Sequence, residues 1–493
     1  MKMSHSTRHK RRRSRSNDRF DTQMIANGVL LILFALLAGI ASYTMYAHNI
    51  LAFRHVNVIY TAVLVVVFLV CLLLTLFKKG KHLVTVLLVL FSIVVGVSLF
   101  AFKSLVDVAD NINKTASYSE IEMKVVVPAN SSISDVSELT NVQAPTSADE
   151  SNINALIANI KSEKGVELTV DPVDSYQSAY ENLINGSSQA MVLNSSYSSL
   201  LELSYNDYES NLKTIYTYKI KKAIEDTAKT TDKNVFNIYI SGIDTSGAVS
   251  TVSRSDVNLI LTVNMNTHKI LMTTTPRDSY VRIPDGGADQ YDKLTHAGIY
   301  GIETSVKTLE NLYDIPINYY ARLNFTSFVK LINALGGVTV YNDQAFTSLH
   351  GNYNFGVGNI NLTSGEEALG FVRERYSLEH GDYDRGNNQL KVIQAIVEKL
   401  TSFQSVSNYS DVISTLQDSI QTNMPLNTMM SLVNEQLDSG KTFIFSSQEV
   451  TGTGSTGQLT SYAMPNASLY MIQLDDASVA KASQAIKNVM EGK

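Results

Sequence analysis

Three long apolar segments near the N-terminus constrain this chain more than any other feature. They run from Met24 to Tyr46, from Val56 to Phe77 and from Leu83 to Phe102, and none of them contains a charged residue. Each is about twenty residues long, which is enough for a helix to cross roughly 30 Å of hydrocarbon. Core helices of soluble domains are rarely so long and apolar on every face. The sequence therefore predicts three transmembrane helices within residues 24–102.

The basic residues around these segments predict their orientation. The tail "RHKRRRSRSNDR" and the loop "KKGKH" are basic, whereas Arg54 is the only Lys or Arg in the loop between the first two segments. Because Lys and Arg concentrate on the cytoplasmic side, residues 1–23 are expected to form a cytoplasmic tail. Everything from about Lys103 onward then lies outside the plasma membrane. A cleaved signal peptide is disfavoured, because the first segment is too long and two more follow.

Charge and cysteine content exclude several functions for the outer portion. Residues 1–103 carry 13 Lys and Arg against 2 Asp and Glu, whereas residues 104–493 carry 27 against 44. An acidic outer portion is a poor general binder of nucleic acid, and the basic tail is explained by topology and by attraction to membrane lipid. Cys71, the only cysteine, lies in the second apolar segment. Disulfides and thiolate catalysis are therefore excluded from the outer portion.

The outer portion is predicted to contain two α/β domains. Within residues 117–228, the strand-like "EIEMKVVVP" and "SQAMVLNS" flank the helical pattern of "ESNINALIANIKSEKG", which ends in glycine. This region has no cluster of catalytic residue types, so we interpret it as a small accessory domain. Residues 229–493 contain strands that are apolar on nearly both faces, such as "VFNIYISG" and "VNLILTVNM". Such strands suit a central sheet flanked by helices.

Charged residues, both aspartates and arginines, lie at the ends of these strands. Asp244 follows the strand "VFNIYISG", Arg254 and Asp256 precede "VNLILTV", and Arg277 and Asp278 follow "KILMTTTP". Strand ends are where α/β sheets usually bind ligands. Two carboxylates can hold one divalent cation, and Mg²⁺ (or Mn²⁺) suits carboxylate and phosphate oxygens. Asp244 and Asp256 are therefore the candidate metal ligands.

The stretch "FVRERYSLEHGDYDRGNNQ" adds further cations. Arg373 and Arg375 lie two apart near the end of one predicted helix, and Arg385 and Gln389 lie four apart on one face of the next. Guanidinium groups bind phosphate oxygens in a bidentate manner, so the whole set predicts a phosphate site. The alternative is surface ion pairing between sequence neighbours, such as Arg254 with Asp256 and Asp384 with Arg385.

Other catalytic patterns are absent from the sequence. The outer histidines do not pair at metal-ligand spacing, and there is no H-E-x-x-H motif, nucleophile elbow or Walker loop.

Several ordered motifs carry a resemblance to a known family. The chain resembles the LytR–CpsA–Psr (LCP) family of Gram-positive cell-wall enzymes over about residues 240–400, and its membrane segments and accessory domain resemble the streptococcal capsule branch. The motifs are "SGID" (241–244), "RSDVNLILTVN" (254–264), "TPRDSYV" (275–281), "YDKLTHAGIYG" (291–301), "INYYARLNFTSFVKLINALGGVTV" (317–340), "GEEALGFVRER" (365–375) and "GDYDRGNNQ" (381–389). One departure is Asn388, where many relatives have arginine, which removes one possible cationic contact.

The resemblance implies an Mg²⁺-dependent phosphotransferase. Such an enzyme moves a capsular or other cell-wall glycopolymer from a polyprenyl diphosphate carrier to peptidoglycan and releases polyprenyl phosphate. The polymer on its carrier, peptidoglycan and membrane lipid are then the expected partners, with capsule-assembly proteins as further candidates. By the same resemblance, Arg254, Arg277, Arg373, Arg375, Arg385 and Gln389 bind the diphosphate, and Arg277, Arg375 and Arg385 act catalytically. We expect the carrier tail to enter an apolar slot formed by residues 318–335 and 390–400.

Two alternatives remain open at the level of sequence. The chain could be a membrane-bound transcriptional regulator of capsule synthesis, a hypothesis favoured only by the basic tail, which has no helix-turn-helix pattern and few apolar residues. It could also be a polyprenyl diphosphate hydrolase that uses the same site with water as the acceptor.

Overall fold

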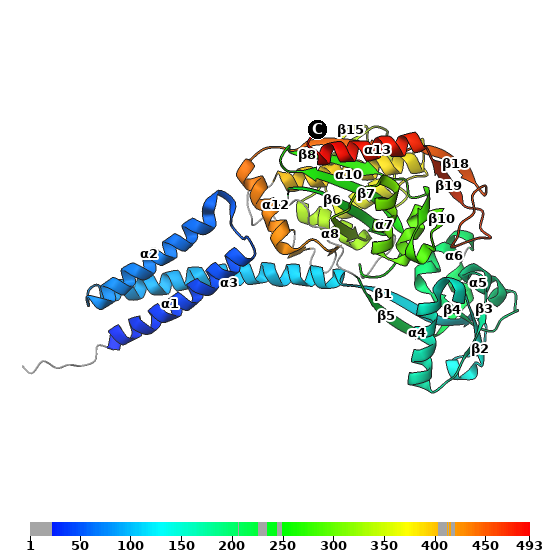
Figure 1. Cartoon of the computed structure of the whole chain (residues 1–493), viewed down its shortest axis with the longest axis horizontal. Coiled ribbons are helices and arrows are strands. Elements are labelled where there is room, and N and C mark those ends of the chain that lie inside the picture. The colour runs from blue at the N-terminus through cyan, green and yellow to red at the C-terminus, as the bar shows by residue number, and fades with distance from the viewer. Residues whose placement is uncertain are drawn as a thin grey trace, which may run out of the picture. The chain divides into compact units, whose positions relative to one another are not determined.

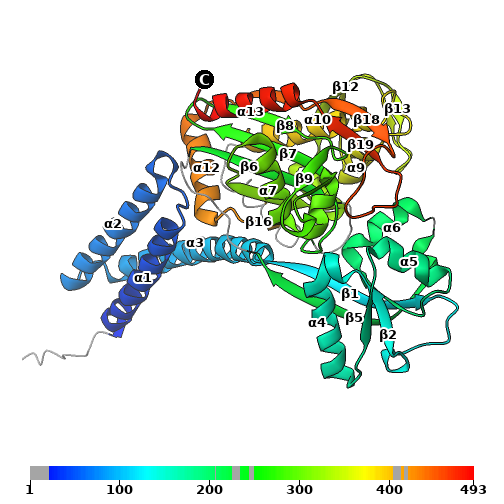
Figure 2. The same ribbon diagram turned by 45° about the vertical axis from the view of Figure 1, so that its right-hand side comes forward.

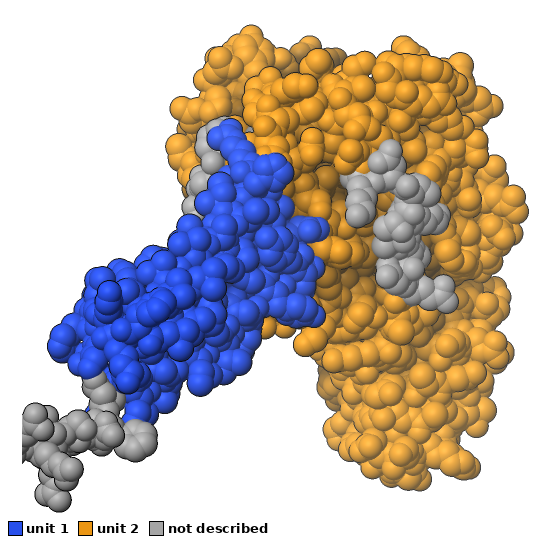
Figure 3. Space-filling model, turned by 60° about the vertical axis from the view of Figure 1, so that its left-hand side comes forward, with its two compact units in different colours: residues 1–104 blue, residues 105–493 orange. Residues whose placement is uncertain are grey.

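The computed structural model divides the chain into two compact units. It describes residues 22–205, 207–224, 234–243, 249–402, 412, 414–415 and 420–493. The first unit ends at Ser104 and the second begins at Leu105 (Figures 1 and 3). Three α-helices form most of the described part of the first unit, and that of the second unit contains two larger β-sheets, four two-stranded sheets and the helices around them.

The first unit contains the three predicted apolar helices. They are α1 (Thr22–Ala47), α2 (Val56–Leu76) and α3 (Lys81–Ala116), and each is long and apolar enough to cross a membrane. The side chain of Asn27 lies between α1 and α3, where its Nδ2 donates to the Lys81 carbonyl (3.0 Å) and its Oδ1 accepts from Thr85 (2.6 Å). The third helix continues fourteen residues past Phe102, the end expected from the apolar pattern, into the second unit. The chain is thus a membrane-anchored protein.

A five-stranded sheet begins directly after α3. Its order is β3-β2-β4-β1-β5, with β1 antiparallel to both of its neighbours. The side chains of β1 alternate between two cores, because successive residues of a strand point to opposite faces. Met123 and Val125 pack with Ile153 and Leu156 of α4, whereas Val126 packs with Tyr180 of α5. The elements are β1 (Tyr118–Pro128), β2 (Asn141–Ala144), α4 (Thr146–Lys164), β3 (Thr169–Pro172), α5 (Tyr176–Ile184), β4 (Met191–Asn194), α6 (Ser198–Ser204) and β5 (Leu212–Ala223).

A six-stranded mixed sheet forms the centre of the larger α/β region. Its order is β16-β11-β6-β7-β8-β17, in which β11 runs parallel to β6, β8 runs parallel to β17 and the other pairs are antiparallel. The strands are β6 (Val235–Ile243), β7 (Ser255–Asn264), β8 (Lys269–Thr274), β11 (Tyr319–Leu323), β16 (Ile420–Thr422) and β17 (Ile444–Glu449).

Helices cover both faces of this sheet (Figure 2). Ile260 of β7 belongs to a core with Leu309 of α7 (Ile302–Tyr313) and Ile486 of α13 (Asp476–Met490). Leu261, the next residue, belongs to a core on the opposite face with Ile393 of α10 (Asp382–Thr401). The helix α12 (Leu426–Ser439) packs on that second face too. The predicted α/β architecture with a helix-flanked sheet is therefore confirmed.

The remaining elements lie around the central sheet. They are the strands β9 (Tyr280–Ile283), β10 (Gln290–Lys293), β12 (Val338–Asn342), β13 (Phe346–Thr347), β14 (Asn354–Phe355), β15 (Gly358–Leu362), β18 (Gly452–Thr456) and β19 (Tyr470–Leu474), the 3₁₀ segment η6 (Leu294–Tyr300), and the helices α8 (Phe325–Leu335) and α9 (Gly365–Arg373). Two expected details are wrong. Asp256 lies inside β7 and not before it, and α9 ends at Arg373, so Arg375 lies beyond the helix. The accessory boundary near residue 228 stays a prediction, because residues 225–233 are outside the described part.

A fully buried arginine ties the two sheets together. Arg322 of β11 is 2% exposed, and its guanidinium donates to the carbonyls of Val249 (3.2 Å) and Thr251 (2.9 Å). The same segment pairs with β1, since the Glu120 amide donates to the Ser250 carbonyl (3.0 Å). Burial lowers the pKa of Arg322 to about 10, so the side chain stays charged at neutral pH.

Replacing Arg322 tests whether this side chain holds the two sheets together. Arg322→Met removes this donor from the carbonyls of Val249 and Thr251 and from Oε1 of Gln421, and we expect the free energy of unfolding to fall by about 2 kcal/mol. Urea unfolding of the full chain in detergent, followed by tyrosine fluorescence, measures the change. The exposed Arg282 provides the control, because Arg282→Met should change stability by less than about 0.5 kcal/mol. If Arg322→Met and the parent were equally stable, removal of the buried charge would offset the free energy lost with the hydrogen bonds.

Candidate functional site

One cavity contains nearly all of the predicted site residues. Its volume is about 810 Å³, and it is open to the surface on the face of the central sheet that α8 and α10 cover. The lining includes all six residues predicted to bind a diphosphate and one of the two predicted metal ligands, namely Arg254, Asp256, Arg277, Arg373, Arg375, Arg385 and Gln389. These residues come from positions up to 135 apart in the sequence and from four separate segments. Their chemical roles stay predictions.

Most of the rest of the cavity wall is apolar, although Asn324, His350 and Glu374 also line it. The apolar wall is built from strands β6, β7 and β11, helices α8, α9 and α10, and the residues Val412 and Ile420. Phe325, Phe328 and Leu331 come from α8, and Ile393 and Leu400 come from α10, as expected for the slot between residues 318–335 and 390–400. A single cavity thus joins a cationic region to an apolar region. Leu203 of α6 also lines it, so the region predicted as accessory contributes to the wall.

An ion pair connects the ends of β7 and β8 at the cationic region. Nη1 of Arg277 lies 2.5 Å from Oδ2 of Asp256, and Oγ1 of Thr295 donates to Oδ1 of the same carboxylate (3.1 Å). Burial alone would raise the pKa of Asp256. The positive charges of Arg277, Arg254 and Arg385 outweigh burial and hold this pKa below its usual value. Asp256 is therefore ionised at neutral pH.

A buried carboxylate shapes the turn that carries Arg375. Glu374 is 3% exposed, and its oxygens accept hydrogen bonds from the backbone amides of Leu349 (2.6 Å), Arg375 (2.9 Å), Tyr376 (2.8 Å) and Ser377 (3.0 Å). Burial raises the pKa of Glu374, but these backbone bonds outweigh it, so the pKa lies below the usual value. Sequence reasoning missed this residue, because a glutamate between two arginines looks like one of their salt-bridge partners.

Aromatic rings support the two arginines that flank Glu374. The Arg373 guanidinium lies over the ring of Phe325, 4.3 Å from its centroid, and the Arg375 guanidinium lies over the ring of Tyr376 at 4.5 Å. Stacking of this kind limits the conformations of a guanidinium without neutralising it. Both cations are thus partly preorganised at the cavity.

The start of α10 is held by Asp384. Its Oδ2 accepts from Nε2 of Gln344 (2.7 Å) and from the His380 amide (2.9 Å). In the same helix, Nε2 of Gln389 donates to the Val372 carbonyl at the end of α9 (3.3 Å). These contacts fix the helix end that carries Arg385. Asp256 pairs with Arg277, which is distant in the sequence, and these contacts of Asp384 involve Gln344 and His380. Pairing of Arg254 with Asp256 and of Asp384 with Arg385, the alternative given by the sequence, stays a hypothesis.

The metal site can be assessed at one of its two predicted ligands. Asp244 lies outside the described residues, so its position stays a prediction. Asp256 supplies an ionised carboxylate at the cavity beside several arginines that are predicted to bind phosphate, which fits the single carboxylate that Mg²⁺ can use together with substrate phosphates. Within the part of the chain that the structure describes, no group of three or more His, Cys, Asp or Glu could hold a metal by itself.

A further carboxyl group, beside the first turns of α10, was not predicted. Glu449 ends β17, and its Oε1 would lie 3.7 Å from a Cβ atom placed on Gly386, the residue after Arg385. Burial raises the pKa of Glu449 to about 7. The signal was present in the sequence, since Glu449 closes the strand-like "KTFIFSSQEV" just as Arg277 follows its own strand.

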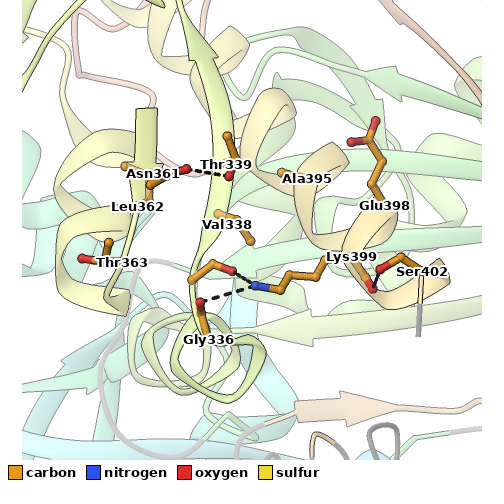
Figure 4. A pocket seen from close by; sticks show the side chains of 11 residues that line it. Gly336, Val338, Thr339, Asn361, Leu362, Thr363, Ala395, Glu398, Lys399 and Ser402 are labelled. Atoms are coloured by element: carbon orange, nitrogen blue, oxygen red, sulfur yellow. Dashed lines mark hydrogen bonds between the residues drawn. The ribbon is translucent and has the colours of Figure 1, made fainter. Parts of the chain in front are cut away.

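A second cavity of about 540 Å³ lies between α10 and the β12–β15 ribbon (Figure 4). Its polar groups are bonded within the protein. Nζ of Lys399 donates to the carbonyl of Gly337 (2.6 Å), and Oγ1 of Thr339 donates to Oδ1 of Asn361 (2.7 Å). None of the predicted site residues lines this cavity.

The low pKa of Asp256 leads to a pH-dependent prediction. A carboxyl group with a depressed folded-state pKa stabilises the fold above its unfolded-state pKa of about 3.9, and that stabilisation disappears as the pH falls through the folded value. We therefore expect Asp256→Asn to lower the melting midpoint at pH 7, and the difference from the parent to shrink below about pH 4. Midpoints measured between pH 3 and pH 7 test this. Asp289→Asn, at an exposed carboxylate, should show little difference at any pH, and a pH-independent deficit of Asp256→Asn would contradict the assigned ion pair.

Comparisons with known proteins find relatives among cell-wall transferases. A relative from Enterococcus faecalis, named polyisoprenyl-teichoic acid–peptidoglycan teichoic acid transferase TagU, is 33% identical over 282 residues, which cover 56% of this chain and 87% of the relative. A protein of the same name from Oceanobacillus iheyensis is 35% identical over 232 residues, covering 46% and 69%. The crystal structure of B. subtilis TagV covers 53% of this chain and 99% of its own, with 24% identity and a TM-score of 0.46.

Two family models match parts of the sequence. The model described as DNA polymerase processivity factor matches residues 78–193, which join an apolar helix to most of the five-stranded sheet. That range is less than half of the chain and does not show membership. The model of the LytR_cpsA_psr family matches residues 202–478, more than half of the chain and including every described residue of the cationic region. The chain belongs to the LytR–CpsA–Psr family.

Proposed function

We propose that this protein transfers a capsular or other cell-wall glycopolymer from a polyprenyl diphosphate carrier to peptidoglycan. The observation that supports this most is the joining of a cationic region and an apolar region in one cavity. A diphosphate and a prenyl chain have the same two properties within one molecule. The relatives described above are named as transferases that act between polyisoprenyl-linked teichoic acid and peptidoglycan.

The cationic residues suit the charge changes of this reaction. An acceptor hydroxyl oxygen forms a bond to the sugar-proximal phosphorus, and the bond from that phosphorus to the bridging oxygen breaks. The polyprenyl phosphate leaves with the bonding electrons, and the hydroxyl proton passes to a base or to solvent. Arg277, Arg375 and Arg385 would stabilise the negative charge that develops on the phosphate oxygens. Arg254, Arg373 and Gln389 would hold the diphosphate in the same cavity.

Asp256 would hold Mg²⁺ (or Mn²⁺) together with substrate phosphates, with Asp244 as the second predicted ligand. When bound, the ion supplies positive charge that neutralises the leaving phosphate.

The orientation in the membrane forms part of the proposal. The tail before the first apolar helix and the loop before the third are both basic. We therefore propose that the N-terminus lies in the cytoplasm and the cavity outside. A carrier whose tail stays in the outer leaflet and an acceptor in the wall would then meet on the same side of the membrane. Capsule-assembly proteins stay candidate partners.

Two other functions make different predictions. A hydrolase would release polyprenyl phosphate without any acceptor, whereas a transferase requires a peptidoglycan fragment. A regulator that acts through its basic tail would lose function when residues 1–21 are deleted, whereas an enzyme would keep its activity if membrane insertion is intact.

Removing Arg375 tests the proposed function. The purified full chain is given a prenyl-diphosphate-linked oligosaccharide and peptidoglycan fragments, and both the ligated product and the released prenyl phosphate are measured. We expect Arg375→Ala to lower the transfer rate by about 100-fold, the size of effect seen when one group that stabilises transition-state charge is removed. Arg282→Ala, at an exposed site outside the cavity, is the control and should retain the parent rate. Acceptor-independent release by the parent would favour hydrolysis, and a normal rate in Arg375→Ala would contradict the assigned role.

The metal is tested by titration calorimetry on the full chain. One carboxylate, or two, makes a weak site for Mg²⁺ unless phosphate oxygens complete the coordination. Mg²⁺ should therefore give little heat with the protein alone and a clear signal after geranyl diphosphate is added, and Asp256→Ala should lose that second signal. Tight binding of Mg²⁺ without diphosphate would contradict a site that substrate phosphates complete, and full transfer activity in EDTA would show that the arginines act without the metal.

A further inference from the structure

We propose that Thr295 is a positioning residue for Asp256, and that the segment η6 is built to hold it in place. This inference rests on the proposed function, because it concerns the carboxylate that faces the diphosphate and the metal. Thr295 was not among the predicted site residues and does not line the cavity.

Thr295 contacts both members of the central ion pair. Its hydroxyl donates to Oδ1 of Asp256 (3.1 Å), and its backbone amide donates to the Arg277 carbonyl (2.9 Å). Arg277 binds the other oxygen of Asp256. Two donors on two different oxygens fix the rotation of the carboxylate plane, which a single donor would leave free. Thr295 is 1% exposed, so water does not replace its hydroxyl.

A buried cluster anchors the start of η6. Oδ1 of Asp292 lies 2.8 Å from Nδ1 of His296, and the same carboxylate accepts hydrogen bonds from Oγ of Ser461 (2.7 Å) and the amide of Ala463 (2.8 Å). Asp292 and His296 are 1% and 0% exposed. A network of this kind, within a low-dielectric interior, resists displacement of its members. Thr295 lies between these two residues in the sequence, so its backbone is held from both sides.

Glycine allows the other end of η6 to approach β7. A Cβ atom on Gly298 would lie 2.5 Å from the Ser253 carbonyl oxygen and 2.7 Å from the Ser255 amide nitrogen. No side chain fits at that distance, so η6 lies directly against the backbone on either side of Arg254. The approach sets the distance between Thr295 and Asp256, which follows Ser255 in the chain.

The end of η6 reaches the helices of the five-stranded sheet. Ile299 belongs to a core with Tyr176 of α5, with Tyr197, which directly precedes α6, and with Leu201 of α6. The same short segment therefore contacts the Asp256 carboxylate at one end and the region predicted as accessory at the other. The region predicted as accessory therefore supports the site by packing against η6.

The experiment compares three variants of the full chain in detergent. Thr295→Val keeps the shape of the side chain and removes the hydroxyl, Thr295→Ser restores the hydroxyl, and Thr308→Val removes an equally buried threonine hydroxyl from α7, where it bonds only to a helix carbonyl. Each is assayed for kcat, KM and the Mg²⁺ concentration that gives half of the maximal rate. The shift of the melting midpoint by geranyl diphosphate with Mg²⁺ is measured in parallel.

We expect Thr295→Val to lower kcat and to raise the Mg²⁺ requirement by about tenfold each, as for other residues that orient a metal ligand. KM and the ligand-free midpoint of Thr295→Val should match those of Thr308→Val. The midpoint shift that diphosphate with Mg²⁺ gives in Thr295→Val should be smaller than in the parent. Thr295→Ser should recover most of the lost kcat and of the lost midpoint shift. Gly298→Ala should also raise the Mg²⁺ requirement.

Specific outcomes overturn the inference. If Thr295→Val has the kcat and Mg²⁺ requirement of Thr308→Val, or if Thr295→Ser is no better than Thr295→Val, Thr295 does not position Asp256. If the parent shows neither transfer nor a midpoint shift with diphosphate, the proposed function itself is wrong, and the inference falls with it. If the parent transfers normally and Thr295→Val is unaffected, only the positioning role of Thr295 is contradicted.

Discussion

The ion pair between Asp256 and Arg277 is the interaction on which the site depends. Both groups are mostly buried, with 18% and 11% of their side chains exposed, and a charge moved from water to a protein interior loses several kcal/mol of hydration. The attraction between them offsets part of that loss, and a threonine hydroxyl satisfies the second carboxylate oxygen. Because Arg254 and Arg385 add further positive charge around one carboxylate, the site has an excess of cations. Such an excess is favourable when an anionic ligand is bound.

The apolar part of the cavity explains why this charge can be concentrated at the surface of an acidic domain. The walls from α8 and α10 exclude water from one side of the cationic region, so its interaction with a phosphate is stronger than in bulk solvent. Helix α10 packs on one face of the central sheet, α8 packs against α10, and β7 supplies Asp256 from that sheet. The cavity and the ion pair are therefore two consequences of the same layered packing.

Residues that support the site differ in kind from those that line it. Glu374 organises a turn through four backbone amides, Asp384 fixes a helix start, and Asp292 anchors η6. Each is an acidic residue close in sequence to an arginine, lysine or histidine, and in each case its hydrogen bonds go largely to backbone amides or polar side chains. A sequence with alternating charges looks the same whether its acidic side chains bond to neighbouring cations or to backbone amides. The sequence alone therefore could not assign these roles.

The sequence by itself determined the three apolar helices, the α/β pattern and the arginine-rich set at element ends, because these depend on local periodicity and on residue type. It also indicated the apolar slot, since residues 318–335 and 390–400 are rich in apolar side chains at helical spacing. Only the tertiary structure decided that Asp256 pairs with Arg277, that Arg375 lies beyond its helix on a turn held by Glu374, and that Thr295 joins the ion pair. Those contacts connect residues brought together by the sheet order and by the close approach of η6 at Gly298, and the distance between two segments in space is not a property of either segment alone.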